Sequence, residues 1–449
     1  MDQRLKNMTA GRPVPLILSF ALPLMAGSVF QQLYTVTDTM VVGKVLGVDA
    51  LAALGAADWF NWMMLGTVQG FTQGFAIPMA QHFGADRHDA LRQAVGAAVT
   101  LSAALALVLT LAGQLLITPV LALLHTPAEI VGGSRLYLRI MFGGTPVVMA
   151  FNLLACVLRS LGDGGTPLRA MIVSSLTNIA LDVLFVMVFG WGIAGAAAAT
   201  VIAQGLSALY CLGRAAKLDI LRLSADDLRL RPGLLGRLLA LGSPMAFQNC
   251  VIAVGGMILT ALVNGFGVPF IAGYTAANKL FGVLEMAAVS YGYAMITYVG
   301  QNLGAGKTRR IRQGVRSALG ISAVTSLAIA AVMLSFGRPI LACFISGGPE
   351  QFDLALATAY RYLAVMSVCL PALYVLHVVR SALQGMGNTV MPMVSGIMEL
   401  GMRTGVALAL TRLIGGPGVF FAEVSSWMGA DVVLTASYLH SVRRLPPDE

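Results

Sequence analysis

The stretch AQHFGADRHDALRQAV at residues 80–95 recurs in altered form as GQNLGAGKTRRIRQGV at residues 300–315. A second stretch, LRSLGDGGTP at 158–167, recurs as LQGMGNTVMP at 383–392. The residues identical in the first pair are Gln81, Gly84, Ala85, Arg92, Gln93 and Val95, which return as Gln301, Gly304, Ala305, Arg312, Gln313 and Val315. Between these stretches, Tyr137, Leu138 and Pro146 return as Tyr362, Leu363 and Pro371. Three matches in the same order indicate two copies of one unit.

The composition is that of a membrane protein with many spans. Of the 449 residues, 57% are hydrophobic and 11% are charged, whereas about a quarter of a soluble globular protein is charged. We attribute the net charge of +9 to cytoplasmic loops, which collect Lys and Arg. We expect no nucleic-acid partner, because no soluble module presents a basic patch. The five cysteines are far apart, which favours small buried side chains over a disulfide framework.

Twelve apolar segments divide the chain, and most are long enough to cross a membrane core of about 30 Å as helices of roughly 20 residues. No alternating pattern of about ten residues indicates a barrel. The sequence therefore predicts an all-α polytopic membrane protein with twelve transmembrane helices in two six-helix, pseudo-symmetric lobes. The segments lie near residues 16–43, 51–79, 95–118, 137–158, 168–190, 193–213, 235–264, 271–299, 315–336, 358–382, 391–412 and 417–439.

The repeat also predicts the domain organisation. We expect an N-terminal lobe at 1–213, a cytoplasmic linker at 214–234 and a C-terminal lobe at 235–449. Because each copy has an even number of spans, both enter the membrane from the same side, as parallel repeats of transporters do. Two lobes with a seam between them suit transport by alternating access, and a scaffold without transport is the alternative.

The positive-inside rule orients the spans. With a cytoplasmic N-terminus, 21 of the 29 Lys and Arg residues fall in cytoplasmic segments, Arg380 at the end of the tenth span among them. Cytoplasmic loops are the ones that carry such an excess. We therefore expect a multi-pass protein of the cell membrane with both termini inside.

Seven carboxylic residues fall within the predicted spans, where each costs at least about 2.5–3.5 kcal/mol. They are Asp38, Asp58, Asp182, Glu285, Glu399, Glu423 and Asp431. In the fifth span, TNIALDVLF at 177–185 places Asn178 and Asp182 four residues apart, hence on one helix face. Asp38 lies in the first span, one turn after Tyr34. These groups could bind a cation or hold a proton, and a polar network that only joins helices is the alternative.

The second lobe lacks counterparts of these two aspartates. It carries Lys279 and Glu285 in the eighth span, and Glu399 and Arg403 in the eleventh. Since Glu399 and Arg403 stand at i and i+4, we expect them to form a charge pair. The hypothesis is a C-lobe polar network that neutralises itself, with a coupling role for Glu399 left open.

GTVQGFTQG at 66–74 places three glycines four residues apart in the second span. Such GxxxG spacing allows another backbone to pack closely, so we interpret it as a packing face. Gln69 and Gln73 lie on an adjacent face and are candidates for cavity lining.

No motif for catalysis or nucleotide binding is present: the sequence has no HExxH, GxSxG, P-loop or dinucleotide-binding fingerprint. The five histidines form no metal-spaced cluster. We therefore expect no enzyme, no cofactor and no metal beyond a coupling ion, with an intramembrane enzyme as the rival class.

The chain resembles the multidrug and toxic compound extrusion (MATE) family over nearly its whole length. The resemblance rests on QQLYTVTDTMVVGKVLGVDALAALG at 31–55, the two recurring loops quoted above, and NIALD at 178–182. It implies a V-shaped arrangement of two six-helix lobes. It also implies efflux of small organic cations in exchange for Na⁺ or H⁺, by a protein that we expect to be a monomer in the lipid bilayer.

The resemblance is closer to the DinF-like branch, which has a cation site in the N-terminal lobe. In that branch the site positions correspond here to Asp38, Asn178 and Asp182, with Thr200 on the sixth span and Tyr34 as a neighbour. The NorM type instead has a Glu in the seventh span and an Asp in the tenth, and this chain has an acid in neither.

The same two-lobe architecture occurs in flippases of lipid-linked precursors and in polysaccharide exporters, which form the alternative function. A cavity for a diphosphate would be expected to contain more cationic residues. Only Lys279 and Arg403 fall well within predicted spans, both near acids.

Overall fold

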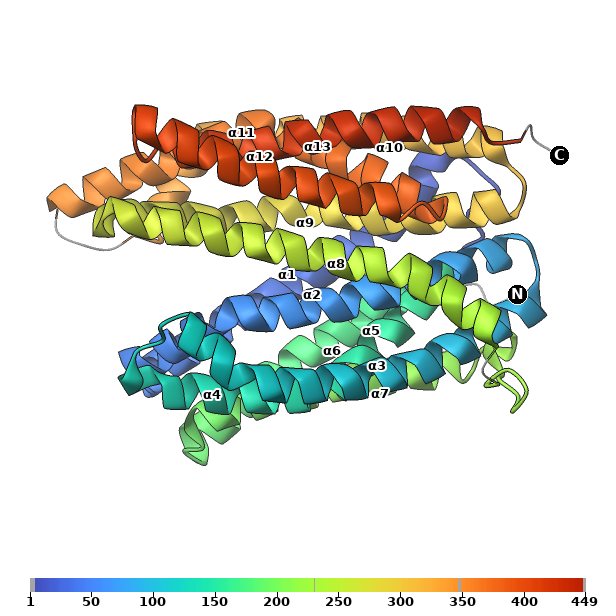
Figure 1. Ribbon diagram of the computed structural model, residues 1–449, viewed down its shortest axis with the longest axis horizontal. Helices are drawn as coiled ribbons and strands as arrows, with labels where there is room; N and C mark the ends of the chain where they lie inside the picture. Colours follow the sequence, from blue (N-terminus) through green and yellow to red (C-terminus); the bar gives the residue numbers. More distant parts are fainter. Residues whose placement is uncertain (1–4, 230, 346–348, 447–449) are drawn as a thin grey trace. The chain divides into compact units, whose positions relative to one another are not determined.

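The computed structural model describes residues 5–229, 231–345 and 349–446, and within these ranges it is helical, with no strand (Figure 1). The twelve predicted apolar segments lie largely in helices. The first copy contains α1 (Pro13–Val45), α2 (Val48–Gly84), α3 (His88–Leu123), α4 (Ala128–Gly143), α5 (Thr145–Ser160), α6 (Gly165–Asp182), η1 (Val183–Val188) and α7 (Gly192–Ala215). After η2 (Asp219–Leu221), the second contains α8 (Pro232–Val263), η3 (Asn264–Phe266), α9 (Val268–Gly304), α10 (Thr308–Ala342), α11 (Pro349–Gly385), α12 (Val390–Ile414) and α13 (Gly418–Arg443).

Length and composition confirm a multi-span membrane protein. Ten helices in the described part are long and apolar enough to cross a membrane, and α4 and α5, bent by 48°, meet the same criteria only when taken together as one broken segment. The bend replaces the single straight helix expected at 137–158. Helix α2 is as long as α9, at 37 residues, but it carries Asn61, Gln69 and Gln73 and is not among these ten.

The structure divides into two compact units. The N-terminal unit contains Leu22–Cys250 and the segment that ends at Met8, and the C-terminal unit contains Thr9–Ala21 and the chain from Val251 onward. Helix α1 thus begins in the C-terminal unit and ends in the N-terminal unit, and α8 does the reverse. The lobes predicted from the sequence are bounded by the repeat, whereas these two units are bounded by how the chain packs in space.

The two copies agree in backbone detail. Helices α2 and α9 both follow a glycine with a φ of 87°, Gly47 and Gly267 respectively. After α2, Asp86 has a φ of 55°, and after α9 the matching residue Gly306 has a φ of 70°. Because few residues adopt positive φ without strain, the shared turns support the inference of a duplicated unit.

The second recurring loop, between α5 and α6 and between α11 and α12, is also the same structure twice. Each loop contains a glycine of positive φ, 82° in one copy and 86° in the other. The Thr166 backbone N–H donates to Asp163 Oδ1 at 2.9 Å, and the Met391 N–H donates to Asn388 Oδ1 at 3.2 Å. In both copies a side-chain oxygen therefore satisfies a donor at the start of the following helix.

The glycine face of α2 packs against the first half of α8, within the N-terminal unit. A Cβ at Gly70 would lie 2.4 Å from Ala246 Cα, and a Cβ at Gly74 would lie 2.4 Å from Gly242 Cα. The Asn249 side chain donates to the Gly66 carbonyl at 2.7 Å. The interpretation of this face as a packing surface is confirmed.

We expect Gly70→Ala to destabilise the protein, because the α8 backbone stands where the new methyl group would be. Overpacking of this kind typically costs about 1–3 kcal/mol. Gly55→Ala on the same helix is the matched control, since a Cβ there meets nothing within 4 Å. Thermal unfolding in detergent should show a lower midpoint for Gly70→Ala only. Equal midpoints for the two variants would contradict the close approach of α2 and α8.

Candidate functional site

Two aspartates of the N-terminal unit have buried oxygens without a hydrogen-bond partner. Asp38 lies on α1, and Asp182 is the last residue of α6 and fully buried. Within the part of the chain that the structure describes, Oδ1 of each accepts no hydrogen bond and is shielded from solvent. The two carboxyl groups lie close enough to interact electrostatically. An unsatisfied buried acceptor is costly, so this pair is suited to a proton or a cation.

Asn178 connects Asp182 to Thr200 on α7. In one orientation of its amide, Nδ2 donates to Thr200 Oγ1 at 3.3 Å. In the other, Nδ2 donates to Asp182 Oδ2 at 3.1 Å, and Oδ1 accepts from the Thr200 backbone N–H at 3.3 Å. Only the second orientation gives the carboxylate a donor. Three of the four predicted ligands, Asn178, Asp182 and Thr200, are thus within hydrogen-bonding distance of one another in sequence along this chain of contacts. The fourth, Asp38, is close enough to Asp182 to interact with it electrostatically.

Asp182 stands where α6 changes into a π-helix, a feature that the sequence did not predict. In η1, which follows at once, the Phe189 N–H donates to the Leu184 carbonyl five residues earlier, at 2.9 Å. Short π-helical turns within α-helices frequently occur at functional sites. The change of helix type directs the residues after Asp182 differently from a continuous α-helix.

Two tyrosines complete the surroundings of the carboxyl pair. Tyr34, predicted as a neighbour, and Tyr137 on α4 both interact electrostatically with Asp38 and Asp182. Tyr137 was missed as a site residue, although its recurrence as Tyr362 had marked it in the repeat. Gln69 and Gln73 are half-buried on α2, and their role in a cavity stays a prediction.

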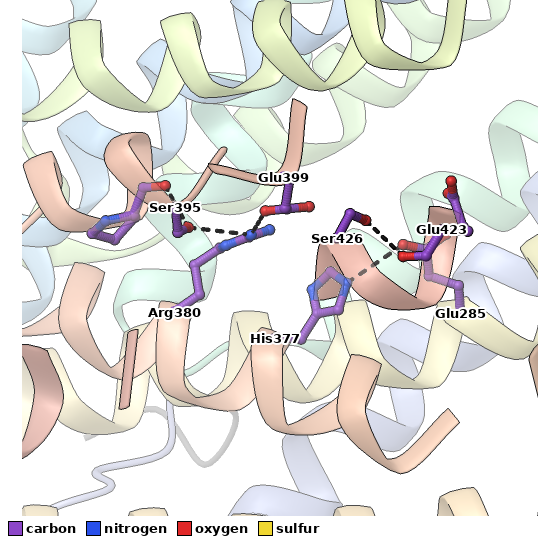
Figure 2. A network of polar contacts seen from close by, with 8 residues as sticks. Glu285, His377, Arg380, Ser395, Glu399, Glu423 and Ser426 are labelled. Atoms are coloured by element: carbon purple, nitrogen blue, oxygen red, sulfur yellow. Dashed lines mark hydrogen bonds and ion pairs between the residues drawn. The ribbon is translucent and has the colours of Figure 1, made fainter. Parts of the chain in front are cut away.

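The C-terminal unit contains a buried network of charged groups from four helices (Figure 2). Arg380 of α11 points at Glu399 of α12, forms an ion pair with it and lies 3.4 Å from Ser395 Oγ. Arg380 is only 8% exposed and Glu399 4%. Arg380, assigned from the sequence to a cytoplasmic segment at the end of the tenth span, is thus buried against Glu399, and its assignment to the cytoplasmic side stays a prediction.

Glu399 and Arg403 do not form the direct pair that their spacing predicted. Arg403 instead places Nε 2.9 Å from Glu423 Oε2 on α13. Neither of these two atoms makes a hydrogen bond in the described part of the chain, so the contact is an ion pair of poor alignment. The i,i+4 rule holds for exposed helix faces, whereas here each residue finds a partner on a neighbouring helix.

The remaining members of the predicted C-lobe network, Lys279 and Glu285, form no ion pair with each other in the described part of the chain. Glu285 of α9 lies 3.4 Å from His377 Nε2 of α11, with side chains 38% and 17% exposed, and Figure 2 shows His377 turned toward it. Glu285 also interacts electrostatically with Glu423. Lys279 is exposed and belongs to no ion pair among the described residues.

Neither unit offers a transition-metal site within the residues that the structure describes. No group of three or more His, Cys, Asp or Glu side chains is placed to hold such an ion. What the N-terminal unit presents is a set of oxygens, which suits protons and hard cations.

The comparison with known families identifies the chain. The family model MatE matches residues 23–184 and 244–408, once in each copy of the repeat. The chain belongs to the MatE family. The predicted resemblance is thereby confirmed, and since this is a family of membrane transporters the chain is a transporter and not an enzyme.

Individual relatives cover most of the MatE chain. "Probable multidrug resistance protein YpnP" of Bacillus subtilis is 29% identical over 80% of this chain and 82% of its own. The "FAD transporter" of Shewanella oneidensis is 23% identical over 80% and 82% of the two chains. A solved MOP superfamily transporter from Pyrococcus furiosus, described by its "reverse polarity of binding pocket", superposes with a TM-score of 0.92, covers 99% of both chains and is 20% identical.

Proposed function

We propose that the protein is a secondary active antiporter that exports small organic cations or drugs in exchange for Na⁺ or H⁺. The observation that carries the proposal is the pair of carboxyl groups of Asp38 and Asp182 with unsatisfied buried oxygens. Asn178 and Thr200 stand beside them as neutral oxygen ligands. Coupling ions of other two-repeat transporters bind in comparable polar sites near the bilayer midplane.

In the proposed mechanism, an entering cation neutralises the two carboxyl groups and changes which packing of the lobes is stable. Substrate release follows. The exchange requires that the coupling ion and the substrate favour different states, because a ligand that binds both states equally shifts nothing. In this proposal the two lobes comprise residues 1–213 and 235–449, joined by a linker at 214–234. The protein is a monomer of the plasma membrane with both termini in the cytoplasm.

The choice of organic cations as substrates is supported by relatives named for multidrug resistance. The alternative, a flippase or exporter of diphosphate-linked or anionic cargo, needs cationic groups free to bind it. Arg380 and Arg403 are each in contact with a glutamate, which speaks against that cargo. A relative named as an FAD transporter shows that anionic substrates occur among similar chains.

Efflux of ethidium from proteoliposomes, under separate Na⁺ and pH gradients, tests the proposal. Na⁺ needs several oxygen ligands at once, whereas a proton needs one carboxyl group. If Na⁺ is the coupling ion, Thr200→Val should raise the Na⁺ concentration for half-maximal efflux, because it removes one oxygen. If H⁺ is the ion, the parent curve should be flat in Na⁺. Thr411→Val, on α12 of the other unit, is the matched control. No response of the parent to either gradient would overturn the antiport proposal.

A further inference from the structure

The charged side chains between α11, α12 and α13 do not balance. Five ionisable side chains meet between α11, α12 and α13, namely Arg380, Glu399, Arg403, Glu423 and Asp431. Three carboxylates face two guanidinium groups, so the fully ionised cluster carries one negative charge too many. An uncompensated charge within a membrane span costs at least about 2.5–3.5 kcal/mol. One ligand of single positive charge would remove the imbalance.

Asp431 shares its neighbouring cation, Arg380, with Glu399. Glu399 contacts Arg380, and Glu423 contacts Arg403, whereas Asp431 forms no ion pair within the described ranges. Its Oδ1 is shielded from solvent and accepts no hydrogen bond there. The charged groups that face it are Arg380 of α11 and Glu399 of α12. The imbalance is therefore concentrated at one identifiable group.

The surroundings of Asp431 favour a proton over a metal ion. A sodium or potassium ion would need several free oxygens, and the fixed positive charge of Arg380 would repel it. A proton binds one carboxyl oxygen covalently and removes the charge at its source. Buried Nε atoms of Arg380 and Arg403 also lack hydrogen-bond partners among the described residues. Each guanidinium group thus retains one buried donor without an acceptor in that part of the chain.

A second pair links this cluster to the protein exterior. Glu285 and His377 are partly exposed and lie 3.4 Å apart. Glu285 interacts with Glu423 at the buried end. A half-exposed carboxylate within a span normally faces a water-filled space rather than lipid. The pair of Glu285 and His377 is therefore the end of the network that faces such a space.

We propose that the charged network of the C-terminal unit is a second proton-binding site, in which Asp431 holds one proton. The site is built entirely from the C-terminal unit. It does not depend on which ion the Asp38 and Asp182 pair binds, and it gives the transporter a second titrating centre.

Counting bound protons tests the site directly. The purified protein in detergent is titrated with acid and base through the range in which carboxyl groups and histidine titrate. At neutral pH the parent should bind one proton more per chain than Asp431→Asn. Glu399→Gln should lose the same proton, because two carboxylates then match two guanidinium groups. The exposed Asp353→Asn, on α11, is the control and should retain it.

Three outcomes decide the proposal. Equal proton counts at neutral pH for the parent, Asp431→Asn and Glu399→Gln overturn it, and if Asp431→Asn fails to fold, Glu399→Gln decides alone. Replacement of choline chloride by NaCl should leave the number of bound protons unchanged. If Na⁺ displaces the proton, the ligand of Asp431 is a metal cation and the proposal of a proton site is overturned. In an Asp182→Asn background the Asp431 substitution must still remove one proton, which separates this site from the coupling site.

Discussion

Replacing Asp182 with asparagine is expected to abolish cation-coupled efflux while leaving a folded protein. The substitution keeps the size of the side chain and removes the charge that a cation or proton would neutralise. Asp182 is fully buried, with Oδ1 unpartnered in the described part of the chain. An interaction with a buried charged group is worth about 1.5–3 kcal/mol, which corresponds to a loss of about 10- to 150-fold in affinity for the coupling ion.

The measurement is ethidium efflux from proteoliposomes under Na⁺ and pH gradients, with the amount of inserted protein determined in parallel. Asp38→Asn should behave alike, because the two carboxyl groups act on the same ion. Asp353→Asn, an exposed residue of α11, should transport as the parent does. Parent-like efflux by Asp182→Asn, at equal insertion, would remove this residue from the coupling mechanism.

The fold could be predicted from the sequence because its signals are local and repeated. Twelve apolar segments gave the helices, and the matching loops gave the duplication, which the shared positive φ values of Asp86 and Gly306 support. The bend of 48° between α4 and α5 was missed, although Gly143, Gly144 and Pro146 stand together at the break and proline is a common cause of a kink. The π-helix after Asp182 was also missed, because it has no sequence signature.

The N-terminal site was easier to predict than the C-terminal network. Asn178 and Asp182 share a helix face by spacing alone, and the resemblance supplied Thr200, whose contact with Asn178 the structure contains. Tyr137 was not predicted, since an aromatic residue in an apolar span normally indicates packing. In the C-terminal unit, spacing suggested a pair within α12, but partners on α11 and α13 are closer. Ion pairs between helices depend on tertiary packing, which no periodicity encodes.

Arg380→Gln is expected to destabilise the protein more strongly than Gly70→Ala does. Glu399, 4% exposed, would lose its partner and remain buried as an uncompensated charge. Breaking a buried pair in this way typically costs about 3–5 kcal/mol. Asp431 would lose the same neighbouring cation. The other nearby guanidinium, that of Arg403, is already in contact with Glu423.

The double variant Arg380→Gln/Glu399→Gln should recover part of this loss, because neither partner is then left charged. Thermal unfolding midpoints in detergent for the parent, both single variants and the double variant form a double-mutant cycle. If the losses of the single variants simply add in the double variant, the two side chains are not coupled. The deficit of Arg380→Gln should also shrink as the pH is lowered, since a protonated Glu399 no longer requires a cation. A deficit that is constant with pH would mean that lost packing of the arginine stem, rather than an unpaired carboxylate, causes the destabilisation.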